Sequence, residues 1–123
     1  MLYAILCYDC EDVVSAWSKE KEASVMDALG VVQDKLAKAG RLGPVARLLP
    51  TTAATTVRKS GQPLVIDGPF AETKEQLLGF FIVECADLEE AVETAKELAR
   101  ANQSEGAYEL RPLGLFRPGP GLP

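Results

Sequence analysis

Apolar residues cluster in several short runs along the chain. Nearly every position is apolar in residues 2–8 and again in residues 79–85, which is typical of strands that are buried on both faces. Shorter runs predict further strands, two of which have β-branched residues and form the arms of a predicted hairpin. These strands are expected at residues 45–49, 55–59, 63–66 and 108–113, with the second and third forming a hairpin around Ser60-Gly61.

Two longer segments have the periodicity of amphipathic helices. The first is predicted over residues 18–39, where Val25, Leu29, Val32 and Leu36 form one apolar stripe. Ser18 can cap its start, and Gly40 can end it in a left-handed turn. The second follows Asp87, which forms a capping-box pattern with Glu90, and its inner stripe is expected at Leu88, Val92, Ala95 and Leu98 or Ala99.

This order predicts an α+β domain over residues 1–113, with a ferredoxin-like β-α-β-(hairpin)-β-α-β arrangement. The sheet should be antiparallel with both helices on one face. Because the two longest strands are apolar on both sides, the other face needs a cover. A symmetric second copy is the simplest one, giving a dimeric α/β barrel. The Pro- and Gly-rich residues 114–123 should form a flexible tail.

Composition restricts the classes of function. A chain of 123 residues is the size of one domain. The net charge is −5, and the thirteen basic residues are scattered among eighteen acidic ones, which argues against nucleic-acid binding. The longest apolar run is far shorter than the roughly 18 residues of a membrane span. No signal peptide is visible, so we expect a cytoplasmic protein without membrane contact.

The absence of histidine is a further restriction. It removes the commonest acid–base group near neutral pH and the commonest metal ligand. Cys7 and Cys10 have C-x-x-C spacing, which leaves three alternatives: a redox pair, a metal site, or cysteines that pack as small hydrophobes. Cys7 lies inside a predicted buried strand and Cys85 is remote from it, so the last alternative is favoured. No metal or cofactor is expected.

Residues 65–84 carry the most specific motif of the chain, Asp67-Gly68-Pro69-Phe70 followed by Glu72, Lys74, Glu75 and Gly79-Phe80. This pattern resembles the DGPF signature within the YCII-related proteins. The resemblance implies a small dimeric α+β barrel, and it covers residues 2–112. The family usually has a second glycine before Gly79, where this chain has Leu78, so the neighbouring cavity should differ in shape.

Asp67 is the candidate catalytic residue. An aspartate at the start of a turn usually bonds the N–H two residues later, but that residue is Pro69, which has none. The carboxylate then bonds Phe70 N–H in a rigid turn, or it faces a ligand. The resemblance implies a His–Asp dyad in the related proteins, of which this chain has only the aspartate. Candidate ligand-binding residues are Tyr8 at a strand end, Phe70 in the motif, and the strand arginines Arg58 and Arg111, of which one beside Asp67 would bind a carboxylate or phosphate.

Two classes of function follow from these residues. One is a non-catalytic module that binds a small organic ligand near Asp67; the resemblance implies a setting in sigma-factor signalling for such a module. The other is a small enzyme with isomerase- or lyase-like proton transfer, in which Asp67 is the acid or base. The expected partners are a second copy of the chain and the ligand.

One further local structure is predicted. Thr73 and Gln76 match a capping box, which predicts a short helical turn.

Overall fold

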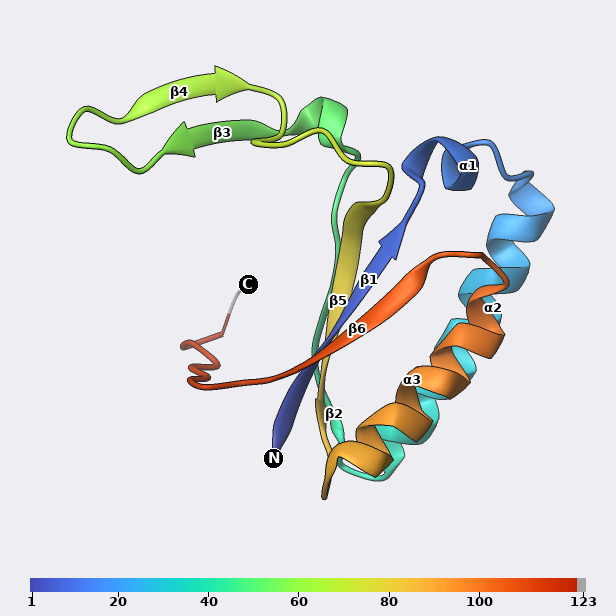
Figure 1. The fold of residues 1–123 in the computed structure, drawn as a ribbon. Coiled ribbons are helices and arrows are strands. Elements are labelled where there is room, and N and C mark those ends of the chain that lie inside the picture. The colour runs from blue at the N-terminus through green and yellow to red at the C-terminus, as the bar shows by residue number, and fades with distance from the viewer. Residues whose placement is uncertain (122–123) are drawn as a thin grey trace.

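The computed structural model describes residues 1–121 and has the predicted order of elements. Two long helices pack on one face of a four-stranded antiparallel sheet (Figure 1). From one edge of the sheet to the other, the strands are β2 (Leu42–Arg47), β5 (Gln76–Glu84), β1 (Leu2–Asp9) and β6 (Ala107–Pro112). The ferredoxin-like α+β class expected from the sequence is therefore confirmed.

Both long helices begin at the cap residues that the sequence predicts. Helix α2 (Lys19–Lys38) follows Ser18, whose hydroxyl accepts a hydrogen bond from the Lys21 amide at 3.0 Å. Helix α3 (Leu88–Asn102) starts with a complete capping box. The Asp87 carboxylate accepts from the Glu90 amide, and the Glu90 carboxylate accepts from the amide of Ala86, both at 2.9 Å. A short helix that the sequence did not predict, α1 (Glu11–Ser15), follows β1 directly.

The core lies between the sheet and these two helices. Strand residues at alternate positions, such as Ile5 and Val83, meet the apolar stripes of α2 and α3 and are fully buried. Val25 and Leu36 on α2 and Leu98 on α3 complete this layer. The predicted stripe of α2 lies in or against the core. On α3 the predicted Ala95 and Leu98 are buried, but Leu88 is 57% exposed, and Ala91 is the buried residue of the first turn instead.

Two elements differ from the sequence predictions. Strand β2 begins at Leu42 instead of residue 45, because Pro44 is tolerated at a register shift in an edge strand. The helical turn expected at Thr73 is wrong, since Gln76 is already the first residue of β5 and pairs with Asp9. The Gln76 side chain bonds the Thr73 carbonyl and the Glu11 amide instead of capping a helix.

The predicted hairpin forms a separate two-stranded sheet of β3 (Thr55–Arg58) and β4 (Leu64–Asp67). It projects from the end of the molecule where α1 lies, toward the side opposite the helices (Figure 1). A short 3-10 helix, η1 (Thr51–Ala53), leads into it. The Glu11 carboxylate accepts hydrogen bonds from the amide and the hydroxyl of Thr51, so the segment that leads into the hairpin is attached to the start of α1.

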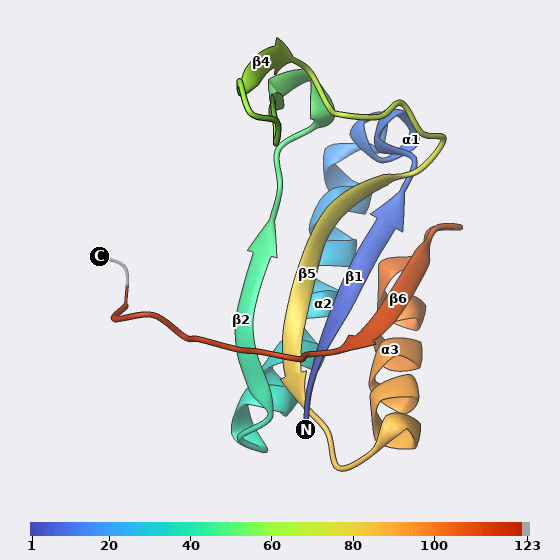
Figure 2. The same ribbon diagram turned by 60° about the vertical axis from the view of Figure 1, so that its left-hand side comes forward.

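The face of the sheet opposite the helices carries no helix, and the segment after β6 runs across this side (Figure 2). Leu6 and Phe80, which are paired across β1 and β5, lie on this open face and are half-buried. The tail predicted at residues 114–123 has no helix or strand up to residue 121, and its last two residues lie outside the described part. Within residues 1–121, no helix has the length and apolar character needed to span a membrane.

Candidate functional site

Two neighbouring cavities lie between the helices and the sheet, and three polar side chains border both of them. We call the larger one the α3 cavity; it has a volume of about 260 Å³ and lies between α3 and β6. The smaller one, the α2 cavity, has a volume of about 130 Å³ and lies between α2 and the sheet. Cys7, Asn102 and Tyr108 line both cavities and form their shared wall.

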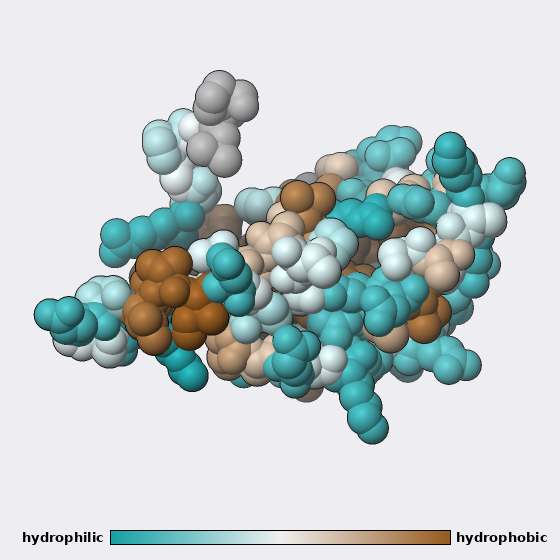
Figure 3. All heavy atoms as spheres, turned by 90° about the horizontal axis from the view of Figure 1, so that it is seen from above, coloured by the Kyte–Doolittle hydropathy of each residue, from teal (hydrophilic) through white to brown (hydrophobic). Residues whose placement is uncertain are grey.

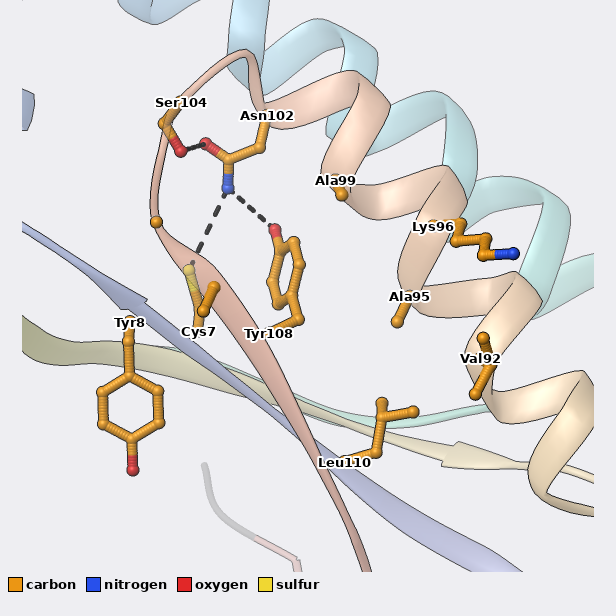
Figure 4. A pocket seen from close by; sticks show the side chains of 12 residues that line it. Cys7, Tyr8, Val92, Ala95, Lys96, Ala99, Asn102, Ser104, Tyr108 and Leu110 are labelled. Atoms are coloured by element: carbon orange, nitrogen blue, oxygen red, sulfur yellow. Dashed lines mark hydrogen bonds between the residues drawn. The ribbon is translucent and has the colours of Figure 1, made fainter.

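These three side chains come from two paired strands and from the end of α3, and they form a hydrogen-bonded cluster (Figure 4). Cys7 and Tyr108 are opposite each other on β1 and β6. Asn102 is the last residue of α3, and its side-chain amide donates to the Tyr108 hydroxyl at 2.8 Å and lies 4.0 Å from the Cys7 sulfur. The Ser104 hydroxyl in turn donates to the Asn102 carbonyl oxygen at 3.2 Å, which fixes the amide orientation.

The α2 cavity is mostly apolar. Side chains of Trp17, Val25, Met26 and Leu29 line one side, and Phe81 lines the other. Leu78, which replaces the glycine usual in the related sequences, also borders it. The polar residues on its border are Cys7, Asp9, Glu22, Gln33, Arg47, Asn102 and Tyr108. An apolar pocket with a few polar groups is the usual form of a small-molecule site.

Asp9 brings a carboxylate to this cavity from the end of β1. The residue is 6% exposed, and it is buried partly because Gly106 lies against it. A Cβ atom at position 106 would come within 2.1 Å of the Tyr8 carbonyl oxygen and 2.9 Å of Asp9 Oδ2. Only glycine fits there, so the loop between α3 and β6 closes tightly over the strand end.

Burial keeps two groups of the cluster neutral. It raises the pKa of the Cys7 thiol above the ordinary value of 9.0, although hydrogen bonds from Tyr108 and Asn102 oppose the shift. Burial also raises the pKa of the Tyr108 hydroxyl, and the nearby Cys7 and Asp9 add to the shift. At neutral pH the cluster therefore offers a thiol, a phenol and an amide, which form hydrogen bonds but are poor nucleophiles or bases.

The predicted ligand-binding residues Tyr8 and Arg111 lie on the sheet. Tyr8 borders the α3 cavity, but Figure 4 shows its ring pointing away from the Cys7–Tyr108 cluster. Arg111 lies on β6 opposite Ala4, is largely exposed, and pairs with Glu109 at 3.5 Å. Neither side chain joins the polar cluster.

The other three predicted residues lie on or beside the hairpin. Asp67 ends β4 and is paired with Thr55, whereas Arg58 is paired with Leu64 at the other end of the same two strands. The register therefore separates Arg58 from Asp67, and Phe70 is 77% exposed. None of the three borders either cavity. Apolar side chains gather on this arm, at the left of Figure 3; the exposed ones are Val57, Leu64, Val65 and Ile66.

Asp9, Asn102 and Tyr108 are not among the residues predicted from the sequence. Asp9 directly follows the apolar run of residues 2–8, and Asn102 and Tyr108 lie in the last helix and strand without a recognisable motif. A usable signal was present: a carboxylate directly follows an apolar strand, and a Gly precedes the final strand. The interpretation of Cys7 as a packed thiol is consistent with its half-buried position and free state. Among residues 1–121, no group of three Cys, Asp or Glu side chains is arranged to hold a metal ion.

Comparison with known proteins gives two matches over nearly the whole chain. A family model described as the YCII-related domain matches residues 1–117. An uncharacterised protein of Rhizobium meliloti (strain 1021) is 61% identical over 120 residues, which are 97% of each chain. Both matches include β1, α3 and β6, the elements that carry the polar cluster.

Proposed function

We propose that this chain, which belongs to the YCII-related family, is a dimeric binding protein for a small organic molecule held in the α2 cavity. The observation that carries this proposal is the Cys7–Asn102–Tyr108 cluster at the border of an apolar cavity. The apolar walls would bind the body of the ligand, and the cluster would bind one polar group. A cavity of roughly 150 Å³ holds a benzene-sized molecule, which sets the scale of the ligand.

Binding without reaction is the better supported role. The raised pKa values of Cys7 and Tyr108 leave both groups protonated near neutral pH. Proton transfer by Asp67 is the alternative. That carboxylate lies outside both cavities, and within residues 1–121 no ion pair or hydrogen bond links it to another titratable side chain. A general acid–base site needs its partner within hydrogen-bond reach of the reacting group.

A second copy is the proposed cover for the open sheet face. Leu6 and Phe80 lie on this face, and the hairpin with its exposed apolar side chains projects on the same side. A two-stranded hairpin is marginally stable alone, so a partner that covers it would stabilise its fold. Asp67 and Phe70 would then meet the partner, and this is the arrangement in which they would contribute to a site. A cytoplasmic ligand-responsive dimer would also suit the sigma-factor setting that the resemblance implies.

The binding proposal can be tested with benzyl alcohol, which combines a benzene-sized body with one hydroxyl group. Trp17 is the single tryptophan of the chain and lines the α2 cavity, so its fluorescence should report binding there. Tyr108→Phe removes a hydroxyl from the cluster but keeps the ring that packs edge-on against Phe81. Losing one hydrogen bond of about 1 kcal/mol should weaken binding roughly fivefold.

Tyr8→Phe is the matched control, since it removes the same group from a ring that points away from the cluster. It should leave the affinity for benzyl alcohol unchanged. Equal affinities of the two variants would contradict a role for the cluster. If neither benzyl alcohol nor a charged or apolar analogue of the same size binds the parent protein at millimolar concentration, a ligand site in the α2 cavity is contradicted.

A further inference from the structure

Asp9 is the one carboxylate among the buried residues of the described chain. Its Oδ1 atom accepts a hydrogen bond from the Cys10 amide at 2.9 Å. Its Oδ2 atom lies on the side of Gly106, a residue without a side chain to donate a hydrogen bond. Within residues 1–121, no donor forms a hydrogen bond with Oδ2, although the residue borders the α2 cavity. One carboxylate oxygen is therefore held by the backbone, whereas the other has no donor within the described residues.

Oδ2 retains accessible surface, because no fully buried side-chain oxygen or nitrogen within residues 1–121 lacks a hydrogen-bond partner. A ligand that displaces water from this carboxylate must supply opposite charge or hydrogen bonds in its place, because taking an ionised carboxylate out of water costs several kcal/mol. The positive side chain on the border of the same cavity is Arg47, whose Nη1 atom lies 3.6 Å from the Glu22 carboxylate. The cavity thus has two carboxylates and one guanidinium on its border, and that guanidinium is paired with the other carboxylate.

We infer that Asp9 binds the ammonium group of a small amine whose apolar body occupies the α2 cavity. This inference rests on the proposed function and adds the chemical class of the ligand. An ammonium group supplies both the missing donor and the missing positive charge, and hydrogen bonds between charged groups are roughly twice as strong as neutral ones. A ligand with a carboxylate or phosphate group would instead be repelled by Asp9 and Glu22.

The volume and the walls of the cavity define the rest of the ligand. About 130 Å³ suits a single ring or a short branched chain. Trp17, Val25 and Phe81 provide aromatic and aliphatic contacts for such a body. Benzylamine therefore serves as the probe, with benzyl alcohol as its neutral analogue and toluene as the analogue without a polar group.

The experiment is a Trp17 fluorescence titration of the full chain with these three compounds near pH 7. Benzylamine should bind the parent protein at least about tenfold more tightly than benzyl alcohol, and toluene should bind most weakly. Asp9→Asn keeps the size of the side chain and an acceptor for the Cys10 amide. It should weaken benzylamine binding by about tenfold or more and leave benzyl alcohol within roughly twofold.

Asp12→Asn is the matched control because it removes the same charge from an exposed position of α1, three residues from Asp9. It should bind benzylamine like the parent, which separates a local contact from general attraction to a negatively charged protein. Equal binding of benzylamine and benzyl alcohol by the parent would overturn the inference while leaving the cavity site intact, and this comparison needs no variant. Unchanged benzylamine affinity in Asp9→Asn would also overturn it. If none of the three compounds binds the parent, the proposed function itself fails.

Discussion

Ionisation of Cys7 and Tyr108 should lower the stability of the fold at alkaline pH. Burial raises the pKa of both groups, so the folded chain retains protons that the unfolded chain releases. The stabilisation is complete below the unfolded-state pKa values, near 9.0 for the thiol and 10.0 for the phenol. It is lost as the pH rises through the higher folded-state pKa values, because stability falls wherever the folded state binds more protons.

We therefore predict that the melting temperature falls between pH 8 and about pH 11, and that Cys7→Ala makes this decline shallower. Cys10→Ala is the matched control: it removes a half-buried thiol from the neighbouring α1 N-cap position. Cys7→Ala should also lower the melting temperature at every pH, since it removes packing, so the slope against pH is the informative measurement. Identical slopes for the two variants would contradict a buried neutral thiol at Cys7.

At the scale of elements, the turn after β4 is held by its backbone. The Gly68 amide donates to the Ala54 carbonyl, and the Thr56 hydroxyl donates to the Gly68 carbonyl, both at 2.8 Å. Gly68 has φ +94°, a conformation that residues with a Cβ atom rarely adopt. The Asp67 side chain is exposed beside this turn and makes none of these contacts.

Asp67→Asn should accordingly change the free energy of unfolding by less than about 0.5 kcal/mol. Gly68→Ala, one residue further, should lower it by about 1–3 kcal/mol because of its left-handed backbone. Chemical denaturation of both variants measures these differences. Asp67→Asn should also leave benzylamine binding unchanged, since Asp67 does not border the α2 cavity. A tenfold loss of affinity in this variant would restore Asp67 as a ligand-binding residue.

Elements were predictable from the sequence where local chemistry determines them. Ser18 and the Asp87–Glu90 capping box mark helix starts, and the apolar runs of β1 and β5 mark the central strands. The candidate site was not predictable in this way. Its cluster joins β1, the end of α3 and β6, and the burial of Asp9 depends on a tight contact with Gly106. Such contacts arise from tertiary packing, whereas the hairpin motif is visible because its residues are adjacent in sequence.

At the scale of the whole molecule, the sheet face opposite the helices is crossed by the segment after β6 but carries no helix within residues 1–121. The sheet face opposite the helices spans four strands, and a face of this size covers roughly 500 Å². A stable interface typically buries about 800 Å² on each partner. The hairpin and the segment after β6 project on this same side, and they carry exposed apolar residues such as Val65, Phe70 and Leu115. Together with the sheet they approach the area that a dimer requires.

Because the open face and the hairpin belong to the same chain, a two-fold axis would allow each copy to cover the other in one self-complementary contact. Light scattering should therefore give about twice the chain mass of 13.2 kDa at micromolar concentration. Leu6→Lys places a charge at the centre of the open face and should shift the protein toward a monomer. Val31→Lys is the matched control, since Val31 is 68% exposed on α2, outside the open face, and its replacement should leave the mass unchanged. A parent protein that stays monomeric across this range would contradict the dimer, and it would leave the hairpin without the partner that its apolar surface requires.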